Sequence, residues 1–157
     1  MSGMVCCFTG HRDIKADDLR RIKPRLIGSI ESLYREGYTV FISGAAIGFD
    51  TYAAAVTASM RAACPGLKLW LAVPFRGHDG CWNEPDRSRF LAISQLCDKE
   101  IVLSERYYRG CYQMRDRWMA EHSTACIACY SGGGGGTAYT IAYALKLGLR
   151  VINIWDD

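Results

Sequence analysis

Residues 125–137 decide the fold, and they read ACIACYSGGGGGT. Ala125–Tyr130 is a short apolar run without polar alternation, which predicts a strand covered on both faces. Ala138–Leu147 has the length and spacing of a helix, and Gly148 follows it. The five glycines between them are more than a turn needs. A free linker is the alternative, but a loop in this position favours binding of a phosphate by backbone amides at the helix start.

Outward from this stretch, short apolar runs alternate with longer amphipathic ones. The predicted strands are Met4–Thr9, Tyr38–Ser43, Leu67–Pro74, Glu100–Leu103, Ala125–Tyr130 and Val151–Trp155. The predicted helices are Ala16–Glu36, which contains Pro24 as a residue that can split or kink it, Phe49–Ala63, Asp86–Cys97, Gln113–His122 and Ala138–Leu147. This alternation predicts one α/β domain over residues 1–157, a three-layer fold with a mostly parallel sheet of about six strands flanked by helices.

The composition is that of an ordinary globular chain, with 50% hydrophobic and 22% charged residues, which argues against disorder. The formal net charge of +3 is too small to predict nucleic-acid binding by itself. Fourteen of the nineteen basic residues are Arg. The planar guanidinium suits phosphate or carboxylate, although a bias in genomic base composition explains the same count.

The eight cysteines are interpreted as reduced thiols of a cytoplasmic protein. Cys6, Cys7, Cys126 and Cys129 lie in apolar strand-like runs, and the first residues lack the features of a secretory signal. Cys126 and Cys129 have CxxC spacing but point to opposite faces of a strand, and no second pair completes a zinc site. We therefore expect no metal and no cofactor. No apolar run reaches the roughly 18 residues of a membrane span, so no membrane partner is expected.

Ligands of open parallel sheets bind beyond the carboxyl ends of the strands, so the loops that follow the strands form the candidate site. Thr9, Gly10, His11 and Arg12 follow the first strand. Gly10 lets the backbone approach a ligand, and the other three supply polar groups. A turn glycine beside a solvated Arg is the alternative. No GxSxG motif accompanies any of the three histidines, so no hydrolytic triad is predicted.

The second loop joins small residues to the start of a helix, where free amides bind anions. It contains Ser43, Gly44, Ala45, Ala46, Ile47 and Gly48. The glycine spacing is not the GxGxxG pattern of dinucleotide-binding proteins. Asp50 either caps the following helix or accepts a hydrogen bond from a ribose hydroxyl.

Other predicted ligand contacts come from three places. Pro74 opens a segment that extends to Arg89, and Trp82 in its polar loop, Phe75–Pro85, either stacks on a base or anchors the loop. Arg115 shares a helix face with Met119 and either contacts a phosphate or is solvated. The predicted phosphate loop comprises Gly132, Gly133, Gly134, Gly135, Gly136 and Thr137, and it is not a Walker A motif because no Lys follows the last glycine.

Four segments in one order form a more specific pattern than any one of them. They are Phe8–Arg12, Ser43–Asp50, Arg115 with Met119, and Tyr130–Thr137 with Thr140, Tyr143 and Ala144. This pattern spans nearly the whole chain and resembles the SLOG superfamily of Rossmann-like nucleotide-sensing proteins. The nearest resemblance is to its YpsA-like group of uncharacterised bacterial proteins.

Two other branches of the superfamily share parts of the pattern. Ser43–Asp50 is similar to the phosphate-site loop of the DNA-processing protein A family, which binds single-stranded DNA. Arg115 and the glycine loop are similar to the LOG enzymes, which cleave cytokinin nucleoside monophosphates into base and ribose 5-phosphate. Where the LOG motif has a Glu and a basic residue, this chain has Thr140 and Asp116. A hydroxyl does not replace a carboxylate in that chemistry, so no catalytic residue is predicted.

The resemblance implies a Rossmann-like fold that binds or senses a nucleotide or a nucleotide derivative, such as an ADP-ribose-like molecule, in the cytosol. It also implies a homo-oligomer, a dimer or a tetramer. Tyr107, Tyr108 and Tyr112 suit a subunit interface or a position beside a ligand equally well. One alternative is a LOG-like phosphoribohydrolase that cleaves an N-glycosidic bond, with Asp50, Asp79 or Glu84 left to supply a carboxylate. The other is a single-stranded DNA-binding module, whose dense basic run would be Arg20, Arg21, Lys23 and Arg25, ordinarily a solvated helix face.

Overall fold

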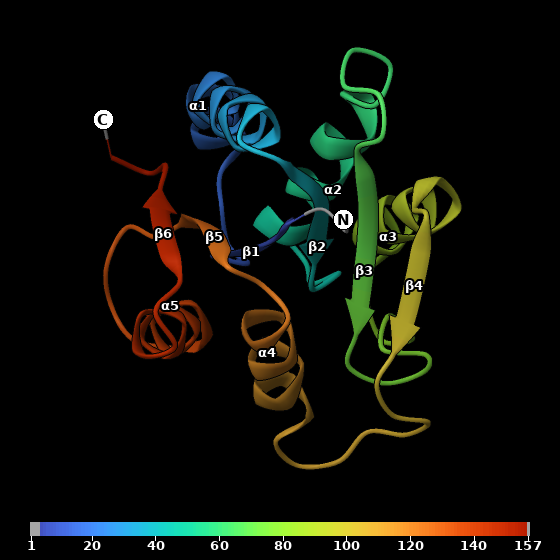
Figure 1. Ribbon diagram of the computed structural model, residues 1–157. Helices are drawn as coiled ribbons and strands as arrows, with labels where there is room; N and C mark the ends of the chain where they lie inside the picture. Colours follow the sequence, from blue (N-terminus) through green and yellow to red (C-terminus); the bar gives the residue numbers. More distant parts are fainter. Residues whose placement is uncertain (1–3, 157) are drawn as a thin grey trace.

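The computed structural model describes residues 4–156, in which six strands alternate with five helices in the order predicted from the sequence (Figure 1). Residues 1–3 and 157 of the predicted domain lie outside this range. The strands are β1 (Met4–Gly10), β2 (Tyr38–Ser43), β3 (Lys68–Val73), β4 (Lys99–Val102), β5 (Ala125–Cys129) and β6 (Arg150–Asn153). The helices are α1 (Ala16–Arg35), α2 (Phe49–Ser59), α3 (Glu84–Leu96), α4 (Cys111–Glu121) and α5 (Gly136–Lys146).

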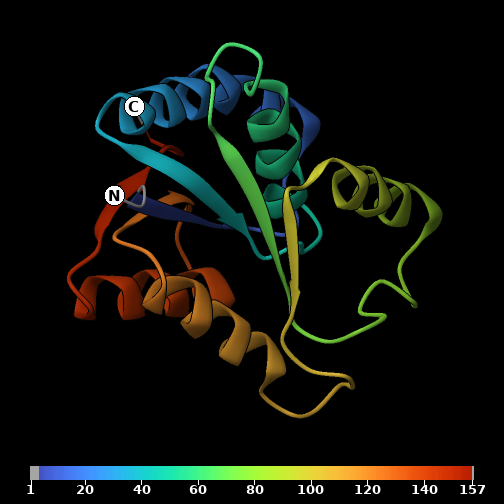
Figure 2. The ribbon, with the colours of Figure 1, turned by 45° about the vertical axis from the view of Figure 1, so that its right-hand side comes forward.

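The strands form one sheet in the order β4-β3-β2-β1-β5-β6, and all neighbours are parallel. The chain builds the sheet outward from β1 to β4 and then returns to add β5 and β6 on the other side of β1. Because crossovers between parallel strands are right-handed, this return places α4 and α5 on the face opposite to α1, α2 and α3 (Figure 2). The result is the predicted single α/β domain of three layers. Its strand order reverses between β1 and β5, where open α/β sheets have their crevice.

Successive residues of the central strands face two separate cores. Cys6 and Cys129 belong to the core beneath α1 and α2, whereas Cys7 and Cys126 belong to the core beneath α4 and α5. The two cysteines of the CxxC stretch therefore lie on opposite faces of the sheet, as strand geometry predicts. All eight cysteines, which fall within residues 4–156, are free thiols.

Three helices, α3, α4 and α5, each begin two residues before the range predicted from the sequence. α5 starts at Gly136 rather than Ala138, because the backbone enters the helix within the glycine run. α3 starts at Glu84 because Asn83 caps it, with the Asn83 Oδ1 accepting the Asp86 N–H at 2.9 Å. A capped first turn carries no apolar residue, so periodicity alone places the boundary too late.

α1 continues through Pro24 without a break, although a proline inside a helix removes a hydrogen bond and crowds the preceding turn. Ile22 and Leu26 on either side are fully buried, whereas Pro24 is exposed. Packing of the apolar face therefore maintains the helix, and the hydrogen bond is lost on the side that faces water. Within the part of the chain that the structure describes, no helix has the length and apolar character needed to cross a bilayer.

Replacing Pro24 by Ala is expected to raise the free energy of unfolding by about 2 kcal/mol. Ala favours a helix interior by about 3 kcal/mol over Pro, and the more flexible unfolded chain offsets part of this gain. Urea denaturation followed by circular dichroism measures the change. Lys23→Ala, at the adjacent exposed position, is the control and should shift stability by less than about 0.5 kcal/mol. A less stable Pro24→Ala variant would contradict the account of α1.

Candidate functional site

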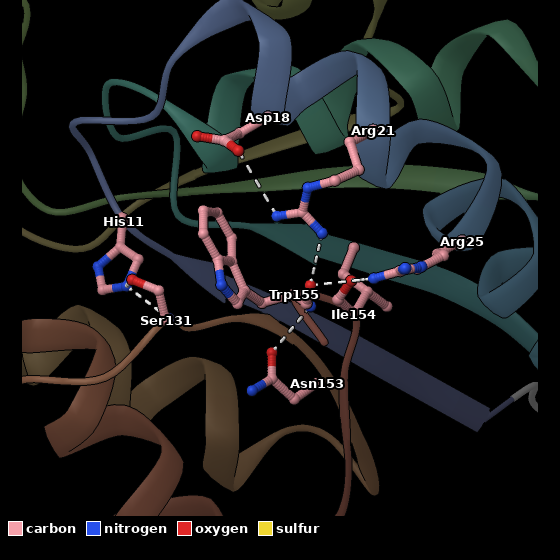
Figure 3. A network of polar contacts seen from close by, with 8 residues as sticks. All are labelled: His11, Asp18, Arg21, Arg25, Ser131, Asn153, Ile154 and Trp155. Carbon is pink, nitrogen blue, oxygen red and sulfur yellow. Dashed lines mark hydrogen bonds and ion pairs between the residues drawn. The ribbon is translucent and has the colours of Figure 1, made fainter. Parts of the chain in front are cut away.

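The loops that follow β1 and β5 are joined where the strand order reverses. The His11 N–H donates to the Cys129 carbonyl at 3.3 Å. His11 Nε2 accepts the Ser131 N–H at 2.9 Å and lies 3.0 Å from Ser131 Oγ (Figure 3). The imidazole also packs on Tyr130, with 5.5 Å between the ring centroids. A side chain from the first loop therefore holds the first residue of the glycine loop.

Beyond Ser131 the glycine loop contacts little of the protein. Gly132–Gly136 are exposed, and a β-carbon built on any of them meets no atom within 4 Å. Three of these glycines have positive φ. The loop leads directly into α5, whose first amides have no acceptor within the helix. It therefore offers open space and backbone donors at the positive end of the helix dipole, the arrangement that binds anions.

The loop between β2 and α2 packs closely on the loop after β1. Gly48 has a φ of +90°, and a β-carbon there would lie 2.4 Å from the Arg12 carbonyl oxygen, so a larger residue does not fit. The Phe49 N–H donates to the His11 carbonyl at 3.1 Å. Arg12 and Gly48 also line a cavity of about 420 Å³, together with Ile14, Ile47 and residues of α1, α2 and α3.

The same loop has a strained backbone that is held from two sides. Ala45 has a φ of +56°, a left-handed conformation that residues other than glycine rarely adopt. Its N–H donates to Ser43 Oγ at 3.2 Å, and its carbonyl lies 3.0 Å from His78 Nε2. The surroundings therefore fix a conformation that an isolated chain would avoid, and such positions cluster at functional sites.

Arg115 is a buried charge beneath this loop. Its Nη1 donates to the Gly44 carbonyl at 2.7 Å, and its Nε donates to Asp116 Oδ1 at 2.9 Å. A β-carbon on Gly44 would lie 2.7 Å from Asp50 Oδ2 and 3.0 Å from Arg115 Nε, so Asp50 flanks the same guanidinium. The structure places this predicted phosphate contact under the loop, where it links α4 to the loop after β2.

Asp50 does not cap α2, which corrects one of its two predicted roles. The N-cap residue is Gly48, and no side chain caps this helix. Asp50 lies in the first turn, and its Oδ1 is buried without a hydrogen-bond partner among residues 4–156. Burial raises the pKa of Asp50 to about 7, against the effect of Arg115 and with a further rise from Asp116. Burial also raises the pKa of Asp116, which Arg115 and the Thr140 hydroxyl lower.

The loop after β3 lies to one side of these groups. Trp82 packs on His78 and Phe90, with ring centroids 5.0 and 6.0 Å apart. Phe90 belongs to the small core between β3, α2 and α3, and Trp82 packs against that core, which is the geometry of a loop anchor. Pro74 is buried at the end of β3. Of the other predicted site residues, Thr9 and Thr137 are buried and Ala46 is half-buried within its loop.

Sequence analysis missed contacts between residues that are distant in the chain. His11 and Ser131 are separated by 120 residues, and Ala45 and His78 by 33. The sequence also gave no sign that Asp116 accepts a hydrogen bond from the buried Arg115. The available signal was position, because His11, Ser131 and His78 all follow strands that end at one edge of the sheet.

Two arginines of the basic run of α1 donate hydrogen bonds to the backbone that follows β6 (Figure 3). Arg21 Nη1 donates to the Trp155 carbonyl at 2.7 Å, and its guanidinium lies 4.6 Å from the Trp155 ring centroid. Arg25 Nη1 donates to the carbonyls of Ile154 and Trp155 at 3.2 and 3.0 Å. Arg20, Arg21 and Lys23 are exposed, as a solvated helix face predicts, whereas Arg25 is half-buried against the end of the chain.

A parallel sheet whose order reverses beside a glycine-rich strand-to-helix loop defines a Rossmann-like α/β protein. Residues 6–148 match the model of YpsA, described as the YspA SLOG family. The chain belongs to this family, as the resemblance of its loops predicts.

Relatives within this similarity include two bacterial proteins. Over 146 residues the chain is 26% identical to the "Uncharacterized SPbeta prophage-derived protein YoqJ" of Bacillus subtilis (strain 168), covering 85% of each chain. Over 111 residues it is 29% identical to UPF0398 protein SH1465 of Staphylococcus haemolyticus (strain JCSC1435). That match covers 69% of this chain but 57% of the relative.

Two solved structures of DNA processing protein A share the fold. The protein from Streptococcus pneumoniae has a TM-score of 0.68 and 19% identity, and the match covers 96% of this chain but 49% of that one. The protein from Helicobacter pylori, described for its single-stranded DNA binding mode, has a TM-score of 0.65 and 18% identity, covering 96% and 64%. The chain thus spans about half to two thirds of these proteins.

The buried carboxyl group of Asp50 predicts a specific pH dependence of stability. Its pKa is about 7 in the folded protein against an ordinary value of 3.8. Between these values the unfolded chain releases the proton and the folded chain keeps it, so the free energy of unfolding falls as pH rises from about 4 to about 7. Asp50→Asn removes this contribution, so the variant gains stability relative to the unmodified protein across that range.

Denaturation at a series of pH values measures this difference. Asp17→Asn removes a carboxylate that is 87% exposed and serves as the control, with little pH-dependent change. Parallel stability curves for the unmodified protein and Asp50→Asn would contradict the assignment.

Proposed function

We propose that this protein binds a nucleotide or a nucleotide derivative at the carboxyl edge of its sheet. The amides of Gly132–Thr137 hold the phosphate, and the loop Ser43–Gly48 faces the ribose. One observation carries the proposal: the glycine loop is exposed, is free of packing contacts at each Cβ position, and starts α5 beside the β1–β5 junction. A loop that served the fold alone would pack against it, whereas this one leaves its donors open to an anion.

Two further features support a nucleotide as the partner. Arg12 is exposed beside the junction and supplies a positive charge. The SLOG family and the shared fold of a single-stranded DNA-binding protein from Helicobacter pylori point to ligands of the same chemical class. Nucleotide phosphates match both the charge and the backbone donors.

A test of the phosphate loop is available at Gly134, which has no positive φ and open space around it. Gly134→Glu is expected to weaken AMP binding at least tenfold, because the new carboxylate repels the phosphate. Gly134→Gln adds a side chain of the same size without charge and should weaken binding less. Isothermal titration measures both affinities.

Thermal unfolding of the free variants provides the control, and both should match the unmodified protein within about 0.5 kcal/mol. Ligand at 100 times its dissociation constant stabilises a protein by about 2.7 kcal/mol, so a shift with AMP is easily measured. Equal AMP affinities of Gly134→Glu and Gly134→Gln would show that the phosphate does not bind at this loop.

A second function, hydrolysis of the N-glycosidic bond of a nucleotide, is favoured by Asp116. Its carboxyl group contacts the Thr140 hydroxyl, so an acid lies where the LOG motif has its Glu. The side chain is 13% exposed, and burial raises its pKa, as suits a general acid.

Chromatography of AMP incubated with the protein tests this second function. Release of adenine that Asp116→Asn abolishes, while AMP still binds, would establish it. Bound AMP that stays intact would leave binding as the function.

A further inference from the structure

Three aromatic side chains gather where the loops after β3 and β4 meet the start of α4. The rings contact one another. The centroids of Phe75 and Tyr107 are 5.6 Å apart and those of Phe75 and Tyr112 are 6.1 Å apart, both edge-to-face, and those of Tyr107 and Tyr112 are 6.3 Å apart. Tyr107 is 61% exposed and Tyr112 is 48% exposed. A cluster of this kind presents ring surface to solvent rather than to a core.

The two loops that carry these rings are fastened to each other. The Arg76 N–H donates to the Ser104 carbonyl at 2.9 Å. The Arg76 guanidinium binds both carboxylate oxygens of Glu105, at 3.0 to 3.3 Å. At the other end, the Cys111 N–H donates to the Tyr108 carbonyl at 3.0 Å. The aromatic cluster is therefore held in place before any ligand arrives.

The cluster borders the loop after β2 on two sides. The Arg115 guanidinium lies 5.8 Å from the Tyr112 ring centroid and donates to the Gly44 carbonyl. The His78 ring lies 6.4 Å from Phe75, and its Nε2 is 3.0 Å from the Ala45 carbonyl. Burial raises the pKa of the Tyr112 hydroxyl, and the charges of Arg115 and Arg12 oppose this rise. The exposed rings therefore border the loop after β2, beside the guanidinium of Arg115.

We infer that Tyr112, backed by Phe75 and Tyr107, is the surface on which the nucleobase stacks. This inference rests on the proposed function, in which the loops beside the cluster hold the phosphate and the ribose. A nucleobase is flat and apolar on its faces, and an exposed tyrosine ring next to cations is a stacking partner for any of the bases. The cluster thus deepens the site from a phosphate site to a nucleotide site.

The sequence offered Trp82 for this role, and the geometry favours the tyrosines. The Trp82 ring already packs on His78 and Phe90, so stacking on a base would have to displace a core contact. Tyr112 has an exposed ring and loses no core contact when a base covers it.

The test compares a ligand that has a base with one that lacks it. In isothermal titration, Tyr112→Leu is expected to weaken AMP binding about tenfold, the effect of losing one base–aromatic stack, and to leave ribose 5-phosphate binding unchanged. Tyr112→Phe keeps the ring and should retain AMP affinity. Trp82→Phe is the matched control and should bind both ligands as the unmodified protein does.

The outcomes separate the two proposals. If Tyr112→Leu weakens AMP and ribose 5-phosphate equally, or weakens neither, the stacking surface is wrong while phosphate binding stands. If the unmodified protein binds neither ligand, the proposed function fails, and the inference falls with it unless a single-stranded oligothymidylate binds. If the oligonucleotide binds and Tyr112→Leu weakens that binding, the stacked base belongs to a nucleic-acid strand. Light scattering follows the variants, because a change of oligomeric state with Tyr112→Leu would assign the ring to a subunit interface and overturn the inference.

Discussion

The buried guanidinium of Arg115 is the interaction on which the carboxyl edge of the sheet depends. A charge removed from water must be matched by acceptors, because an uncompensated buried charge costs several kcal/mol. Asp116 and the Gly44 carbonyl accept hydrogen bonds from Arg115 and meet this need, and Asp50 flanks the same guanidinium. In doing so they hold α4 against the loop after β2. One cation faces two carboxyl groups, so burial prevails and the pKa of both carboxyl groups is raised.

The edge of the sheet is divided between two kinds of surface because the strand order divides it. The loops after β1, β2 and β5 lie around the reversal and contribute glycines and backbone donors. The loops after β3 and β4 lie on the far side and contribute aromatic rings. Arg115 and His78 connect the two parts through Gly44 and Ala45. The topology thereby juxtaposes groups that suit the polar and the flat parts of a nucleotide.

The order of the elements was predictable because each strand and helix carries a local signal. β2 was predicted to the residue, since Tyr38–Ser43 is a mostly apolar run between Gly37 and Gly44. The positions of the glycine loops followed from the same pattern. Side-chain partners did not follow, because His11 and Ser131 meet across 120 residues. A sequence pattern also could not distinguish the half-buried ring of Trp82, which packs on a core, from the exposed ring of Tyr112.

The lack of packing contacts around the glycine loop determines which substitutions the fold tolerates there. Because Gly132–Gly136 leave open space at every β-carbon position, substitutions at the positions without positive φ barely alter folding. Gly44 differs, because a side chain there would collide with Asp50 and Arg115. The loop before α5 can therefore take new side chains without disturbing the packing of the sheet and helices, which the loop after β2 cannot do.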